Sequence, residues 1–135
     1  MKLRTVKGTY TGTPGRYEYT LNEHGQMHGT YRGWYHNGQL MEQSEYVNDK
    51  RRGISLQWHG FGQLWKVKFF DVHGQLLLST SDCAEPHVTI KIAPSDNIEL
   101  AGVLANLVSA LQDDNKTVHM IHITNPLDFN RSITK

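Results

Sequence analysis

Polar and apolar side chains alternate along short runs in the first half of the chain, and turn-forming residues separate these runs. In one such run, Trp34 falls on one face of an extended strand, while Tyr31 and Tyr35 fall on the other. Asn37 and Gly38 follow, a pair that favours a two-residue type I′ turn because both positions there need a positive φ. The pattern therefore predicts a series of antiparallel β-hairpins.

The hairpin pattern repeats at a fixed interval. Tyr10, Trp34 and Trp58 are separated by 24 and 24 residues. The same interval of 24 separates four further pairs, namely Gly29 and Gly53, Gly38 and Gly62, Leu40 and Leu64, and Tyr46 and Phe70. We therefore predict three copies of one hairpin unit, and we expect the repeat-phased aromatic residues to form one continuous stripe on the sheet.

The third copy differs from the second in being apolar on both faces. Trp65, Val67 and Phe69 form its extra apolar face, where the second copy places Gln43 and Glu45 among the equivalent residues. Each large side chain removed from water there stabilises the fold by roughly 1.5–3 kcal/mol. We therefore expect another element to cover the third copy.

The covering element is expected from the segment after residue 80, which has the pattern of a β-α-β unit. Residues 87–92 and 117–124 alternate as strands, and residues 97–112 form a mainly apolar helix. Asp96, with Glu99 three residues later, resembles a capping box. Because more than half of the helix circumference is apolar, we expect the helix to pack on the sheet, and its surplus apolar surface favours a homodimer.

The repeat resembles MORN-type repeats, in the variant found in many bacterial proteins described as antitoxin components. The likeness covers roughly residues 8–78, just over half of the chain. The matching residues are Gly29-x-Tyr31, Trp34-Tyr35-x-Asn37-Gly38-Gln39-Leu40, Tyr46-x-Asn48, Gly53, Trp58, Gly62-Gln63-Leu64 and Phe70. The chain departs from the family in having about three copies and in adding the β-α-β segment, for which no resemblance is found.

The resemblance implies an elongated, twisted antiparallel sheet that serves as a protein-interaction or scaffolding module, with lipid binding proposed for some members. We accordingly predict a mainly β (α+β) fold, an antiparallel sheet of repeated hairpins followed by a β-α-β segment whose helix packs on the sheet. The expected parts are the MORN-like hairpins in residues 1–80, the β-α-β segment in 81–125 and a loose polar tail in 126–135, joined in one compact unit.

Composition narrows the functional classes. A formal net charge of +1 gives no strong field toward nucleic acid or membrane. Cys83 is the single cysteine, so no internal disulfide forms and a reducing compartment is expected. The first residues lack the apolar stretch of a signal peptide, and the longest apolar stretch, within residues 98–111, is interrupted by polar residues. We predict a soluble, cytoplasmic protein with no cofactor.

The principal prediction is a non-enzymatic protein-binding module, possessing no catalytic residues, that acts as a stoichiometric inhibitor of the antitoxin, immunity or phage counter-defence type. Packing of the repeat does not require its additional tyrosines, and tyrosine is enriched at interfaces. The predicted partner-binding residues on an open sheet face are Tyr17, Tyr19, Tyr31, Tyr35, Gln43, Glu45, Arg51 and Arg52.

Two other interpretations remain, and a metal site is also considered. Nucleic-acid or lipid-headgroup binding would use Lys50, Arg51, Arg52, Lys66 and Lys68. A small enzyme would use Cys83 as a nucleophile beside His87. Eight histidines raise the question of a metal site, but they lack partners at ligand spacing. His119 and His122, for example, fall on opposite faces of one strand, so we predict no metal site.

Overall fold

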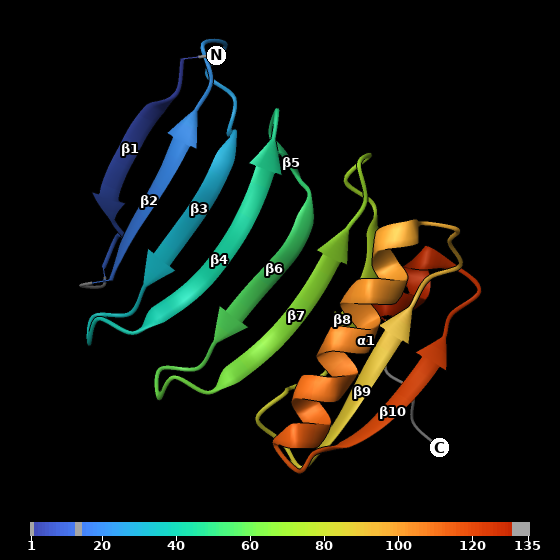
Figure 1. Ribbon diagram of the computed structural model, residues 1–135. Helices are drawn as coiled ribbons and strands as arrows, with labels where there is room; N and C mark the ends of the chain where they lie inside the picture. Colours follow the sequence, from blue (N-terminus) through green and yellow to red (C-terminus); the bar gives the residue numbers. More distant parts are fainter. Residues whose placement is uncertain (1, 13–14, 131–135) are drawn as a thin grey trace.

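The strands form one continuous sheet in the computed structural model, which describes residues 2–12 and 15–130 (Figure 1). Within these residues the sheet has ten strands in the order β1-β2-β3-β4-β6-β7-β8-β9-β10, and β5 pairs with β4 beside this path. The elements are β1 (Arg4–Thr9), β2 (Arg16–Leu21), β3 (Gly29–Trp34), β4 (Leu40–Val47), β5 (Lys50–Arg51), β6 (Gly53–Trp58), β7 (Leu64–Phe70), β8 (Leu76–Thr80), β9 (His87–Ile92), α1 (Ile98–Asp113), β10 (Thr117–His122) and the 3-10 helix η1 (Pro126–Asn130).

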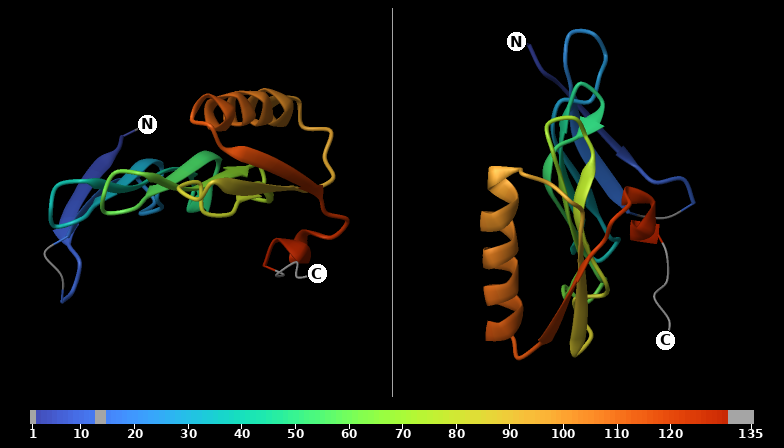
Figure 2. Two further views of the ribbon diagram at one scale, coloured as in Figure 1. Left: turned by 90° about the horizontal axis from the view of Figure 1, so that it is seen from below. Right: turned by 90° about the vertical axis from the view of Figure 1, so that its right-hand side faces the viewer.

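Strands that are neighbours in this order from β1 to β9 pair antiparallel, and β10 pairs parallel with β9 after the crossover through α1. The predicted fold class is confirmed: the protein is mainly β, with successive hairpins and one helix that packs on the sheet. In Figure 2, α1 and η1 lie on opposite sides of the sheet, at its C-terminal end. We call the side covered by α1 the helix face, and the opposite side the tyrosine face, after Tyr17, Tyr19 and Tyr31.

The repeated hairpin turns share one geometry, which is not the predicted type I′. Gly38 N–H donates to Tyr35 O at 3.0 Å, and 24 residues later Gly62 N–H donates to His59 O at 2.9 Å. Each glycine has a positive φ, at 87° and 90°, whereas Asn37 does not. This is the three-residue loop in which a type I turn is followed by a glycine bulge. The two-residue loop of Asn48 and Asp49, with φ of 49° and 71°, has the positive dihedrals expected of type I′.

Bulges beside these turns overturn the predicted aromatic stripe. In β6 and β7, Gln57 pairs with Lys66 and Trp58 pairs with Leu64, so Trp65 is an extra residue. Phe70 pairs with Gly53, which lies an odd number of positions from Trp58 and therefore on the other face. Trp58 consequently points to the helix face and Phe70 to the tyrosine face. The spacing of 24 residues does mark repeated hairpins. The extra residue in each bulged strand, however, reverses the alternation of side chains between the two faces, on which the predicted stripe depended.

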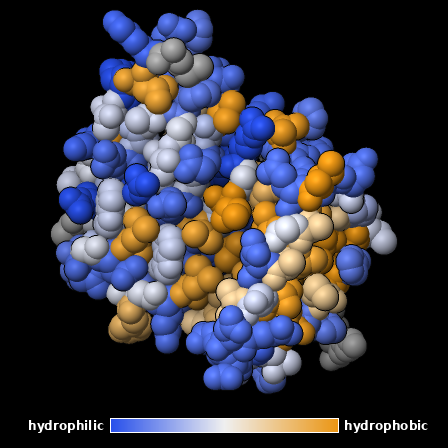
Figure 3. All heavy atoms as spheres, in the orientation of Figure 1, coloured by the Kyte–Doolittle hydropathy of each residue, from blue (hydrophilic) through white to orange (hydrophobic). Residues whose placement is uncertain are grey.

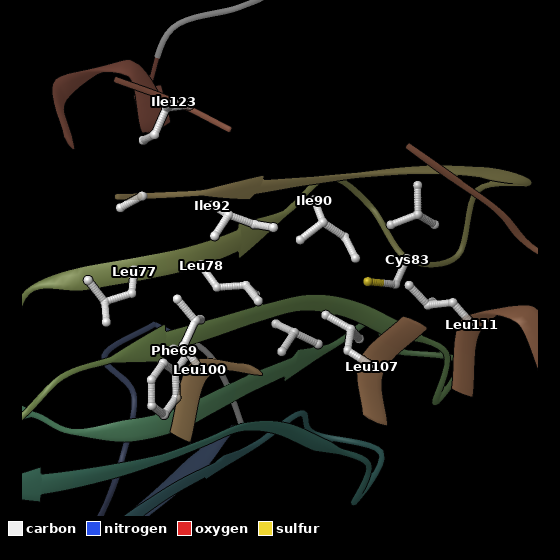
Figure 4. Close-up of a cluster of buried hydrophobic side chains, with 13 residues drawn as sticks. Phe69, Leu77, Leu78, Cys83, Ile90, Ile92, Leu100, Leu107, Leu111 and Ile123 are labelled. Atoms are coloured by element: carbon white, nitrogen blue, oxygen red, sulfur yellow. The ribbon is translucent and has the colours of Figure 1, made fainter. Parts of the chain in front are cut away.

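The hydrophobic core lies between α1 and the last four antiparallel strands (Figure 4). Val67 and Phe69 belong to it, as predicted, but Trp65 does not: the bulge turns Trp65 away, and its ring packs against His59 at a centroid distance of 5.4 Å. The helix contributes Leu100, Leu107 and Leu111. Figure 3 shows the helix face, where apolar side chains gather at the junction of the sheet and α1.

The exposed side of α1 explains why the helix needs only one packing partner, although its sequence indicated more apolar surface than the sheet could cover. Apart from Ile98, which is 92% exposed, this side carries small residues, including Ala101, Gly102 and Ala105. Small side chains expose little apolar surface, so one packed face suffices for the helix. The N-cap is Asn97, whose side chain accepts hydrogen bonds from two backbone N–H groups, and not Asp96 as predicted. The homodimer through residues 97–112 stays a prediction.

The chain after residue 125 is ordered as far as it is described, where a loose tail was expected. Residues Pro126–Asn130 form η1, and Phe129 packs against the core cluster. Lys91 Nζ donates to the carbonyl oxygens of Asp128 and Phe129 at 3.2 and 3.3 Å. The rest of the predicted tail, residues 131–135, lies outside the described residues. Within the described part, no helix combines the length and apolar composition needed to cross a membrane.

The core contacts predict that substitutions on the two sides of α1 change the free energy of unfolding by different amounts. Leu107→Ala should reduce the free energy of unfolding by about 2–5 kcal/mol, because it leaves a cavity against the sheet. Ala105→Ser, on the exposed side two residues earlier, should change it by less than about 0.5 kcal/mol. Urea denaturation followed by circular dichroism measures both. Equal effects of the two substitutions would mean that α1 is packed on a different side.

Candidate interaction surface

Four tyrosine rings, three from β2 and β3 and one from the residue after β1, pack against one another on the tyrosine face. The centroid of the Tyr17 ring lies 5.3 Å from that of Tyr10 and 5.8 Å from that of Tyr19, and Tyr19 lies 6.1 Å from Tyr31. The hydroxyl groups of Tyr10 and Tyr31 share a hydrogen bond of 2.6 Å. Such ring pairs contribute roughly 0.5–1.5 kcal/mol each beyond the area they bury. We call these four residues the tyrosine cluster.

Glycines beneath the rings allow the cluster to lie flat on the sheet. Tyr17 pairs with Gly8 on one side and with Gly33 on the other. A Cβ atom added to Gly8 would lie 2.5 Å from the Tyr17 hydroxyl oxygen, and one added to Gly33 would collide with the hydroxyl of Tyr10. The glycines in these strands therefore provide the space into which the rings fold, and the stacked rings in turn cover strands that lack side chains of their own there.

The tyrosine cluster is ordered and yet accessible. All four tyrosines are half-buried, and neither a helix nor a second sheet covers this face of β1–β4 in the described part of the chain (Figure 2). Partial burial, followed by the hydrogen bond with Tyr10, raises the pKa of the Tyr31 hydroxyl well above its ordinary value. Tyr31 therefore presents a neutral hydroxyl group on this surface at physiological pH.

A polar group adjoins the tyrosine cluster on the same face. Arg51 Nε donates to the Tyr46 hydroxyl at 3.0 Å, and Arg51 Nη2 lies 3.4 Å from Glu42 Oε2. The Arg51 guanidinium also lies 5.9 Å from the centroid of the Tyr46 ring and 5.8 Å from that of Phe70. Glu42 accepts a further bond of 2.9 Å from Ser44 Oγ. These contacts hold Arg51 against the sheet with its charge paired.

Strand register places the tyrosine cluster and this polar group on one continuous surface. Residues that pair directly across neighbouring strands point to the same side of a sheet. One such row crosses from β1 to β7 and consists of Gly8, Tyr17, Gly33, Glu42, Gln57 and Lys66.

The structure places six of the eight predicted partner-binding residues on two opposite surfaces. Tyr17, Tyr19, Tyr31 and Arg51 lie together on the tyrosine face. Gln43 and Glu45 lie on the opposite, helix face, where Gln43 accepts a hydrogen bond from Arg32 and Glu45 accepts one from Thr30.

The remaining two predicted residues lie near hairpin ends. The Tyr35 hydroxyl donates to the Trp58 carbonyl oxygen at 2.7 Å, so this side chain ties two hairpins together. Arg52 is exposed in the sharp connection between β5 and β6. Sequence reasoning missed Tyr10 and Glu42 as members of the surface. The alternation of Gly8 and Gly33 with large aromatic residues was the available signal, because a glycine inside a strand marks a close approach.

Cys83 and His87 are not arranged as a nucleophile and its base. Cys83 is only 3% exposed, and its thiol donates to Thr80 Oγ1 at 3.2 Å. Burial raises the pKa of this thiol, which disfavours the reactive thiolate. His87 is exposed, and no hydrogen bond joins it to Cys83 among the described residues. Cys83 thus belongs to the hydrophobic core.

His59 has a carboxylate partner. Its Nε2 atom lies 2.9 and 3.0 Å from the two carboxylate oxygens of Asp82. Burial acts to raise the pKa of the Asp82 carboxyl, but hydrogen bonds from His59 and from the Ala84 N–H outweigh this, and the net effect is a lowered pKa. No group of three or more histidine, cysteine, aspartate or glutamate residues that could hold a metal ion occurs in residues 2–12 and 15–130.

The five residues of the nucleic-acid or lipid alternative are also divided. Arg51, Lys66 and Lys68 point to the tyrosine face, as their strand pairing shows. Lys50 and Arg52 flank Arg51 and are both exposed, at the end of the hairpin. The predicted basic set is therefore not a single patch.

A scan against models of protein families, a search of curated proteins and a search of solved structures each found no match to this chain. The MORN-type resemblance therefore stays a prediction. What the structure defines is a class of architecture, a single-layer sheet of hairpins that a β-α-β unit closes at one end.

The packing of Tyr17 on Gly8 predicts a local response to a single methyl group. Gly8→Ala should push the Tyr17 ring away from Tyr10 and Tyr19 and change the NMR shifts of these ring protons. Gly60→Ala is the matched control, because a Cβ atom there meets no atom within 4 Å. We expect the control to leave the ring-proton shifts unchanged. Unperturbed ring signals in Gly8→Ala would show that the tyrosines do not rest on the glycine.

The pairing of His59 with Asp82 predicts that Asp82 makes the stability of the protein depend on pH in the acid range. Because the folded-state pKa of Asp82 is lowered from the ordinary value of 3.8, its contribution is present above pH 3.8 and is lost as pH falls through the folded-state pKa. Asp82→Asn should therefore destabilise the protein at neutral pH and flatten the loss of stability toward low pH. Chemical denaturation at a series of pH values tests this, with Asp96→Asn at an exposed position as the control.

Proposed function

We propose that the chain is a non-enzymatic protein-binding module that binds its partner through the tyrosine face. The observation that carries the proposal is the tyrosine cluster, four ordered aromatic rings on a part of the sheet, β1–β4, whose tyrosine face neither a helix nor a second sheet covers in the described residues. Tyrosine and arginine are enriched at the centres of protein interfaces, where a few such residues carry most of the binding energy.

The fixed geometry of the cluster favours affinity. Ordering a flexible side chain at an interface costs roughly 0.5–1.5 kcal/mol. The rings of Tyr10, Tyr17, Tyr19 and Tyr31 already hold one another, and the Tyr10–Tyr31 hydrogen bond fixes two of the hydroxyl groups. The paired charges of Glu42 and Arg51 lie beside the rings and suit the polar rim of such an interface.

The class of partner follows from the MORN-type resemblance. Its antitoxin-component variant supports a stoichiometric inhibitor, such as an antitoxin, an immunity protein or a phage counter-defence factor. Such an inhibitor needs a large and specific contact surface and no catalytic group of its own. The reducing compartment expected from the lone Cys83 supports a cytoplasmic location for both partners.

A pull-down from the cells that encode the chain tests the proposal. We expect one dominant protein partner, held in a defined stoichiometry when the complex is weighed by light scattering. Tyr17→Ala with Tyr19→Ala should weaken this complex by at least thirtyfold, in keeping with the roughly 2 kcal/mol or more lost at interface hot spots. Isothermal titration calorimetry measures the affinities.

The control is Gln43→Ala with Glu45→Ala, which alters the opposite face and should leave the affinity within about twofold. Both variants are compared at a temperature where circular dichroism shows them to be folded. A complex that depends on Gln43 and Glu45 and tolerates loss of the two tyrosines would refute the assignment of the tyrosine face.

A further inference from the structure

A basic pocket lies at the other end of the tyrosine face, where η1 approaches the sheet. Its volume is about 230 Å³. The side chains that line it, from β7, from β8 and the residue after it, and from β9, combine lysines with hydroxyl groups: Lys66, Lys68, Ser79, Ser81, Thr89 and Lys91. Since the share of one water molecule in the liquid is about 30 Å³, the pocket has room for a small organic molecule.

Strand pairing builds this pocket from two neighbouring rows. Lys68 of β7 pairs with Ser79 of β8, and Ser79 pairs with Lys91 of β9, so a serine stands between two lysines. The next row, two residues along each strand, carries Lys66, Ser81 and Thr89. Side chains that pair directly across strands have Cβ atoms roughly 4.5–5.5 Å apart. The register therefore directs three ammonium groups and the intervening hydroxyls toward the same side.

Lys68 lies near other cations. Burial, and then repulsion from Arg51 and Lys66, lowers the pKa of Lys68, although Glu42 acts in the opposite sense. Glu42 itself is paired with Arg51, and Asp82 is paired with His59. Lys91 donates to the carbonyl oxygens of Asp128 and Phe129, so its position at the pocket wall is held by η1. An anion at this place would relieve the repulsion among the lysines.

We propose that this pocket binds a phosphate monoester, with Lys66 and Lys68 on the phosphate and the serine and threonine hydroxyls of the two rows completing its hydrogen bonds. A phosphate monoester carries about −1.5 to −2 charges at pH 7 and three strong acceptor oxygens, and lysine is an established partner for it. Leu76 and Phe129 line the same pocket and provide an apolar wall for the organic part of the ligand. This site is separate from the protein-binding surface proposed above.

The test is a calorimetric titration of the full chain with phenyl phosphate, at constant ionic strength maintained with chloride. We expect saturable binding that inorganic phosphate competes away. Lys66→Met combined with Lys68→Met should weaken binding at least tenfold. Lys7→Met removes an exposed lysine at the far edge of the sheet and should leave the affinity unchanged. Equal binding by the double variant and the wild type, or no saturable binding at all, overturns the proposal.

The fold of the variants is checked by circular dichroism. Should the double variant fail to fold, the single substitutions Lys66→Gln and Lys68→Gln decide, each with an expected weakening of at least threefold. Wild-type affinity in both single variants likewise overturns the proposal.

Vesicles distinguish a lipid headgroup from a soluble ligand. Phosphatidylcholine vesicles that contain phosphatidylinositol 4-phosphate are compared with vesicles of equal charge that contain phosphatidylserine. If the vesicles with phosphatidylinositol 4-phosphate selectively capture the protein, and this capture requires Lys66 and Lys68, the proposal is supported and the phosphate belongs to a lipid headgroup. Binding of phenyl phosphate without vesicle capture supports it with a soluble source. Equal capture by both vesicles without phenyl phosphate binding shows unspecific charge attraction and overturns the proposal.

Discussion

The burial of α1 against β7, β8 and β9 is the interaction on which the rest of the structure depends, because it provides the only continuous hydrophobic core of the described residues. Strands β1–β4 have no such layer on either face (Figure 2). Backbone pairing alone makes isolated hairpins marginal in water. The N-terminal strands are therefore stabilised by continuity with the anchored end and by cross-strand side-chain pairs, among which the tyrosine cluster and the Arg51 contacts stand out. The surface that is proposed to bind a partner is thus also the surface that holds these strands together.

The hairpin repeat, the fold class and the cover over Val67 and Phe69 were all predictable, because a spacing of 24 and an apolar second face are visible in the sequence. The assignment of faces was not. A bulge adds one residue without leaving a mark in composition, and each one reverses the alternation beyond it. Trp65 shows the consequence: it shares a parity with Val67 and Phe69 but packs on His59 instead. The apolar surface of α1 was overestimated from the sequence for a different reason. Alanine counts as apolar in a sequence pattern, but it exposes little surface on a helix.

The candidate site could be predicted in part. Tyr17, Tyr19 and Tyr31 were identified from residue type and came together as a cluster, whereas Gln43 and Glu45 were placed with them only because the bulge was invisible. The row from Gly8 to Lys66 needs the register of five strand pairs, which no local pattern supplies. The lysine pocket likewise combines residues from β7, β9 and the end of β8, which the sequence alone does not bring together.

The two proposed sites share one face, and the group between them determines whether they interact. Arg51 lies between the tyrosine cluster and the lysines, and its charge is paired with Glu42. A paired charge projects a weak field at physiological ionic strength, where exposed charges are screened within roughly 8 Å. Arg51 nevertheless contributes to the lowered pKa of Lys68, so the separation is incomplete at short range. A protein partner that draws Glu42 away from Arg51 would leave an unpaired cation next to Lys68 and strengthen the attraction for an anion in the pocket. The ion pair of Glu42 and Arg51 is therefore the contact through which occupation of one proposed site would affect the other.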